Sequence, residues 1–204
     1  MARRGRPKGR DSAETRIGII NAAREEFTAH GFAGASVATI ASKADLAPSA
    51  VYHYFGGKVA LYEEVFDATN MVVWDVIREA GTQHETLFEN VQSVLQLTIT
   101  MSPEIRRYSD FLALMPMETT LHAEFVHMLE HRNKMQDGLF GTLAEQGLRT
   151  GELAGFDEES ATEMLRSLLM GWFMESYYRQ SSGKASSKGI MQLMQLLRER
   201  AAQD

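Results

Sequence analysis

The sequence contains no cysteine, which excludes disulfides, thiolate zinc sites and cysteine nucleophiles and is typical of a reducing compartment. Proline is scarce: of the 4 present, Pro48, Pro103 and Pro116 stand where helices can begin. The longest apolar runs, 111–117 and 168–174, are far shorter than the roughly 20 residues of a membrane helix. The basic start is followed by polar residues, unlike a secretory signal. We therefore expect a cytoplasmic protein with no membrane span.

Charge is divided unevenly along the 204 residues, whose formal net charge is -6. Residues 1–58 contain 9 basic and 5 acidic side chains, a net charge of +4, whereas the remainder contains 12 basic and 22 acidic ones, a net charge of −10. A basic front favours a polyanionic partner, even though the whole chain is acidic.

Apolar residues recur at the 3.6-residue spacing of amphipathic helices along almost the whole chain, and strand-like alternation is absent from the sequence. We therefore expect an all-α protein. The first helix is expected to bury Ile17, Ile20, Ala23 and Phe27 and to end at Gly31. The expected helices cover 12–29, 36–43, 47–55, 59–80, 86–100, 103–115, 120–145, 158–180 and 187–202.

The second and third of these helices have the spacing of a helix-turn-helix unit, whose second helix lies in the major groove of DNA. The spacing alone also occurs in other small helical bundles. In the third helix, Val51 and Phe55 repeat at i, i+4 and are expected in the core. The residues left to share between the groove and structural support are Ser49, Ala50, Tyr52, His53 and Tyr54.

At these residues the sequence resembles the tetracycline-repressor (TetR/AcrR) family of bacterial transcription regulators, over about residues 15–66. Two positions depart from the family pattern. Asp45 replaces the usual turn glycine but can still adopt the left-handed conformation, and Ala47 replaces the serine that usually caps the third helix. The matching residues are Ala22, Ala23, Phe27, Gly31, Ser36, Ile40, Ala41, Tyr52, Tyr54, Phe55, Lys58 and Leu61.

The resemblance implies a flexible basic arm (1–11), a three-helix DNA-binding domain (12–58) and a larger helical ligand-binding and dimerisation domain (59–204). It also implies which residues contact a double-stranded DNA operator. Base contacts are implied for Pro48, Ser49, Ala50 and His53, and phosphate contacts for Ser36, Thr39, Tyr52 and Lys58.

The arm contains an Arg-Gly-Arg-Pro segment that looks like an AT-hook, in which arginines enter a narrow minor groove. A solvated basic tail is the alternative interpretation. Because a helix-turn-helix follows, we expect Arg4 and Arg6 to enter the minor groove beside the major-groove contact.

The second half is predicted to form a homodimer through the helices at 158–180 and 187–202, whose apolar faces are wider than one core needs. The resemblance implies a ligand cavity in the middle helices, and its methionines and aromatics suit a mostly apolar small molecule. Methionine and aromatic stripes are more often ordinary core than cavity, and the predicted lining residues are Met101, Phe111, Met115, Phe125, Met128, Trp172, Phe173 and Tyr177.

Glu124, His127 and His131 lie at i, i+3, i+7 and could share one helical face, but neighbouring charges favour a solvated surface, so no metal or other cofactor is predicted. No nucleophile-base pair or Gly-rich phosphate loop is present, so we do not expect an enzyme. The sequence therefore predicts a dimeric repressor that a ligand releases from a pseudo-palindromic operator. The alternative is a sequence-tolerant architectural DNA-binding protein that uses the arm; activation rather than repression also stays open.

Overall fold

The computed structural model describes residues 12–178 and 184–201, and within these ranges every regular element is helical. The predicted minor-groove residues Arg4 and Arg6 lie outside the described residues. The elements are α1 (Ser12–Gly34), α2 (Val37–Lys43), α3 (Pro48–Phe55), α4 (Lys58–Gly81), α5 (Leu87–Thr100), α6 (Pro103–Ala113), α7 (Met115–Leu121), the 3-10 helix η1 (Ala123–Phe125), α8 (Val126–Arg149), α9 (Glu158–Tyr178) and α10 (Lys184–Ala201).

The helices form two compact units, which divide the chain differently from the predicted boundary at residue 58. The first unit comprises the described residues up to Asn70 together with Tyr108–Phe125, so α7 and η1 belong to the same unit as α1, α2 and α3. The second unit comprises Met71–Arg107 and the described residues from Val126 onward. The elements α4 and α6 each contribute to both units.

The core of the first unit is built around the aromatic ring of Tyr62 on α4, which is almost fully buried. Phe27 of α1 meets this ring edge-on at 4.8 Å, and Phe125 of η1 stacks on it at 4.6 Å. Such aromatic pairs add to the burial energy of the rings. The predicted α1 face is correct for three residues but wrong for Ile17, which is 57% exposed because the buried stripe passes through Thr15 and Ile19 instead.

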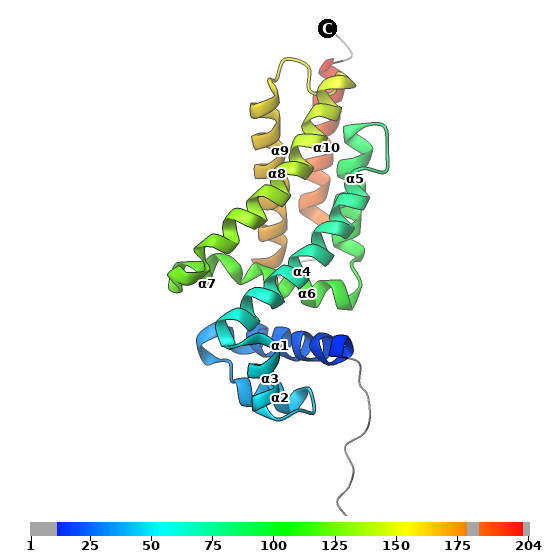
Figure 1. Cartoon of the computed structure of the whole chain (residues 1–204). Coiled ribbons are helices and arrows are strands. Elements are labelled where there is room, and N and C mark those ends of the chain that lie inside the picture. Colours follow the sequence, from blue (N-terminus) through cyan, green and yellow to red (C-terminus); the bar gives the residue numbers. More distant parts are fainter. Residues whose placement is uncertain (1–11, 179–183, 202–204) are drawn as a thin grey trace, which may run out of the picture. The chain divides into compact units, whose positions relative to one another are not determined.

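The second unit has α8 and α9 packed as an antiparallel pair, with α5 and α10 beside them (Figure 1). Its core includes Trp74, Phe140 and Trp172. The helix α10 turns Ile190 and Met194 inward but leaves Leu193 and Leu196 exposed at 42% and 62%.

The region before α8 corrects the predicted helices 103–115 and 120–145. Pro116 opens a separate short helix, α7, because a proline fits a first turn but not a helix interior. His122 is extended (φ -131, ψ 94), which ends α7 before η1. Glu124 therefore lies in η1 while His127 and His131 lie in α8, so the three residues do not share one helical face.

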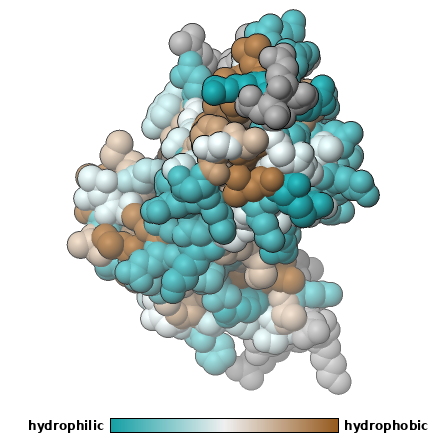
Figure 2. All heavy atoms as spheres, turned by 90° about the horizontal axis from the view of Figure 1, so that it is seen from above, coloured by the Kyte–Doolittle hydropathy of each residue, from teal (hydrophilic) through white to brown (hydrophobic). Residues whose placement is uncertain are grey.

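The surface of the molecule carries few large apolar groups on the face drawn in Figure 2, where hydrophilic side chains dominate and apolar ones form small separate groups. Within the described ranges, no helix combines the length and hydropathy that crossing a membrane would require. Within the same residues, no three His, Asp or Glu side chains gather in a way that could hold a metal ion.

Candidate nucleic-acid interface

The helix α2 is capped by Ser36, whose hydroxyl accepts a hydrogen bond from the backbone N–H of Thr39. Behind this cap lies Glu26 of α1, whose side chain is buried. Its carboxylate accepts hydrogen bonds from the Ser36 backbone N–H (3.4 Å) and from the Lys43 ammonium (2.9 Å). The bond from Lys43 lowers the pKa of Glu26 despite burial. One carboxylate thus holds both ends of α2 against α1.

The turn between α2 and α3 uses Asp45 in the left-handed conformation, with φ at 58°. Two hydrogen bonds close it: the Asp45 N–H donates to the Ser42 carbonyl, and the Leu46 N–H donates to the Ala41 carbonyl. This is the Schellman arrangement that commonly ends helices with glycine. The prediction that Asp45 could replace the family's glycine in this conformation is confirmed.

The helix α3 places its apolar residues inside and its polar residues outside. Val51 and Phe55 are buried, as predicted, whereas Tyr52 is 53% exposed and His53 is exposed beside it. Ala47 stands at the N-cap of α3, and its side chain cannot accept a hydrogen bond. The first backbone N–H groups of α3 are therefore not capped by that side chain. An outward-facing row of polar side chains on a short, firmly held helix is what a major-groove contact requires.

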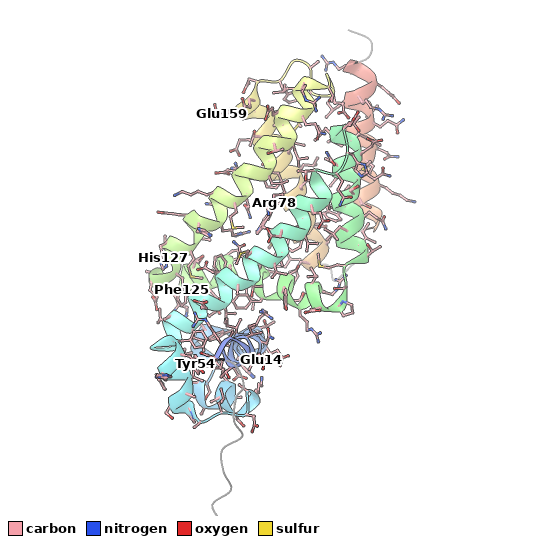
Figure 3. All side chains as sticks on the ribbon, turned by 45° about the vertical axis from the view of Figure 1, so that its right-hand side comes forward. Glu14, Tyr54, Arg78, Phe125, His127 and Glu159 are labelled. Atoms are coloured by element: carbon pink, nitrogen blue, oxygen red, sulfur yellow. The ribbon has the colours of Figure 1, made fainter. Side chains whose placement is uncertain are left out.

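The C-terminal end of α3 is held by Arg16 of α1. Its guanidinium pairs with Glu64 of α4 (2.7 Å), donates to the Tyr54 backbone carbonyl (3.3 Å) and covers the Phe55 ring (4.6 Å). Tyr54, labelled in Figure 3, lies on α3 and is only partly exposed. Because the Tyr54 carbonyl accepts the hydrogen bond from Arg16, we interpret Tyr54 as structural support for α3 rather than as a DNA contact.

The predicted phosphate-binding residue Lys58 stands at the first position of α4 and is partly buried. Its ammonium donates to the Ala33 carbonyl (3.3 Å) and lies 4.8 Å from the centre of the Phe32 ring. No carboxylate within the described residues pairs with it. The charge therefore stays uncompensated and can still attract a phosphate.

The eight predicted DNA-contacting residues that fall in the described part of the chain all lie in the first unit, from the α2 cap to the start of α4. Six of them are exposed and two, Ala50 and Lys58, are partly exposed. The sequence did not indicate Glu26 or Arg16, which orient α2 and α3 from behind. The only available signals were a charged residue, Glu26, on the apolar stripe of α1 and an arginine, Arg16, ten positions before it.

The eight predicted ligand-lining residues are divided between the two units. Phe111, Met115 and Phe125 are fully buried in the first unit, close to Tyr62. The second unit contains Met101, Met128, Trp172, Phe173 and Tyr177. A separate groove of about 390 Å³ lies in the second unit between α5 and α10, and none of the eight residues lines it.

Known proteins match this chain by sequence in the region of the helix-turn-helix. The profile of "Bacterial regulatory proteins, tetR family" matches residues 19–65, from α1 to the first turns of α4. The HTH-type transcriptional regulator UidR of Escherichia coli (strain K12) is 38% identical over 55 residues, which are 27% of this chain. The chain spans only 28% of the length of that curated relative in the match.

Solved structures match nearly the whole fold. A protein of Rhodococcus sp., assigned to the TetR family of transcriptional regulators, has a TM-score of 0.74 at 16% identity and covers 91% of this chain and 99% of its own. The transcriptional regulator FadR from Bacillus subtilis in complex with stearoyl-CoA has a TM-score of 0.70 at 18% identity, over 87% of this chain and 96% of its own. Residues 19–65 thus match the family model of tetR-type bacterial regulatory proteins, and the whole chain shares the helical fold of the solved structures.

Proposed function

We propose that the protein is a DNA-binding transcriptional regulator that inserts α3 into the major groove of its operator. The observation that carries this proposal is the outward row of polar side chains on α3, which is held from behind by Glu26 and Arg16. A helix in this setting can approach base edges without first rearranging its own supports.

The residues on this surface divide by chemistry. Ser49 and His53 carry short or planar polar groups suited to base edges, while Pro48 and Ala50 let the backbone approach closely. The remaining polar groups suit phosphates: Ser36, Thr39, Tyr52 and Lys58. Among the described cations of the first unit, Arg16 and Lys43 are already paired with carboxylates. We therefore assign a large part of the electrostatic attraction to the arm, with Arg4 and Arg6 in the minor groove.

The regulator is proposed to act in the cytoplasm as a homodimeric repressor. Two exposed leucines on α10, Leu193 and Leu196, support a second copy as the partner of that helix. A two-fold dimer would place two α3 helices roughly 34–36 Å apart on a pseudo-palindrome. An enzymatic activity is not part of the proposal, because the relatives are transcriptional regulators.

Release from the operator is proposed to follow binding of a mostly apolar small molecule in the second unit. The support is the likeness to FadR, whose structure contains stearoyl-CoA, and the Met128, Trp172 and Phe173 side chains of α8 and α9. Such a molecule can act only by binding the DNA-incompetent arrangement more tightly than the competent one.

The test is selection of binding sites from random duplex DNA by the purified chain at near-physiological salt. Recovery of one palindrome with A/T-rich flanks is the expected result, because two α3 helices and two arms contact a single site. Recovery of unspecific A/T-rich DNA, with a steep dependence of affinity on salt, would instead support the architectural alternative.

A further inference from the structure

The side chain of Arg132 on α8 is partly buried and has no partner among the described residues. Within the described part of the chain, no ion pair, hydrogen bond or ring contact involves Arg132, and burial alone lowers its pKa. A guanidinium stays charged under all ordinary conditions, so leaving one unpaired in a partly buried position costs free energy. By contrast, Arg166 of α9 pairs with Asp137 and Glu163.

Two further polar groups near this helix pair are left without partners. Gln136 stands one turn after Arg132 on α8 and is 4% exposed, yet its Nε2 amide has no hydrogen-bond acceptor. Ser176 stands on α9, which packs against α8, and its buried hydroxyl oxygen also has no partner. Native proteins leave few buried donors unpaired, and such groups call for a role.

The surroundings of these groups are apolar. Met128 precedes Arg132 by one turn of α8, and Trp172 precedes Ser176 by one turn of α9; both side chains are buried. The three polar groups therefore occur on helical faces that otherwise carry methionine and aromatic side chains. A cation and two neutral hydrogen-bonding groups within an apolar setting suit an amphipathic anion, because guanidinium binds a carboxylate through two parallel hydrogen bonds.

We propose that Arg132, together with Gln136 and Ser176, binds the carboxylate of an amphipathic effector in the second unit, with its apolar part against Met128 and Trp172. This assignment rests on the proposed function, since it names the chemistry of the small molecule that the regulator responds to. The proposal therefore requires the mostly apolar ligand to carry one negative charge.

The test is the thermal stability of the full chain without DNA, in the presence of carboxylates and their matched alcohols. The probes are octanoate, dodecanoate and phenylacetate against octanol, dodecanol and phenylethanol, each below its micelle-forming concentration. At least one carboxylate is expected to raise Tm by roughly 3–10 °C at about 100 times its Kd, and its alcohol is expected to do so far less. Arg132→Gln should lose this shift, whereas Lys134→Gln, an exposed position two residues further along α8, should keep it.

The proposal is overturned if no carboxylate stabilises the natural protein more than its alcohol, or if Arg132→Gln keeps the same shift. A second measurement needs no ligand. Arg132→Met should raise the Tm of the free protein by roughly 2–4 °C, because it removes an unpaired charge from a partly buried position; a fall in Tm would assign Arg132 a structural role instead. Operator selection is measured separately, so loss of DNA binding and loss of carboxylate binding are distinguished.

Discussion

The carboxylate of Glu118 on α7 accepts a hydrogen bond from the backbone N–H of Phe32 at 2.9 Å, across 86 positions of the chain. The bond forms where α1 bends: Gly31 has φ at 66° and ψ at 176°, so the helical ladder is interrupted there. Glu118 is buried, and the Phe32 ring meets His122 of the same segment edge-on at 5.0 Å. The carboxylate thereby replaces the helical acceptor that the bend removes, and it ties α7 to the end of α1.

Replacing Gly31 with alanine should destabilise the protein by about 2 kcal/mol or more. An L-residue is strained at this positive φ, and the added Cβ would stand 2.8 Å from Glu118 Oε1. Gly18→Ala in the same helix is the control: no atom lies within 4 Å of its Cβ, and alanine is the better helix former, so stability should rise by up to about 1 kcal/mol. Urea unfolding of both variants measures the difference. Equal effects would contradict the bend and its contact with Glu118.

Replacing Glu26 with glutamine should lower stability near pH 7 by about 1–2 kcal/mol, because the amide loses the charged hydrogen bond from Lys43. The folded pKa of Glu26 is lowered, so its contribution is complete above the ordinary pKa of 4.5 and is lost as the pH falls below it. The difference between Glu26→Gln and the natural protein should therefore shrink on acidification. Thermal unfolding between pH 7 and pH 3 measures it.

The matched control for this change is Glu25→Gln, at the neighbouring exposed position of α1. An exposed carboxylate contributes little to stability, so the control should stay within about 0.5 kcal/mol of the natural protein at each pH. A pH-independent loss for Glu26→Gln would show that packing, rather than the ion pair with Lys43, gives Glu26 its effect.

Replacing Asp45 with glycine should leave the turn intact and raise stability by up to about 1 kcal/mol. Glycine adopts the left-handed conformation of this position without the strain that a side chain carries there. The gain is limited because glycine also gives the unfolded chain more freedom. Chemical denaturation measures it, with Asp45→Val as the opposite change. Equal stability of the glycine and valine variants would contradict the left-handed turn.

The α2–α3 region could be predicted from the sequence because its determinants are local. The cap at Ser36, the turn at Asp45 and the buried pair Val51 and Phe55 each depend on residues within a few positions of one another. The same locality explains why Pro48 correctly marked the start of α3.

The supports of this region could not be predicted, because they join distant parts of the chain. Nothing near Phe32 indicates that Glu118 will accept its N–H, and nothing near Tyr62 indicates that Phe125 will stack on it. The placement of α7 and η1 with the first unit follows from such contacts. At Ile17 the helix was predicted correctly but its buried face was not. The apolar spacing alone does not determine which of two nearby apolar positions faces inward.

Replacing His53 with alanine should weaken binding to the selected operator by about 5- to 100-fold, the range for losing one good base contact. Specificity should relax at a single base position, because the imidazole is exposed on α3 and its ring contact is with the neighbouring Tyr54 rather than with the core. His131→Ala, at an exposed position of α8, should leave affinity unchanged. Fluorescence anisotropy with operator and single-base variants measures both effects, and circular dichroism should show an unchanged Tm. If affinity falls equally for every DNA sequence, His53 contacts the backbone, and the base contacts must come from other residues of α3.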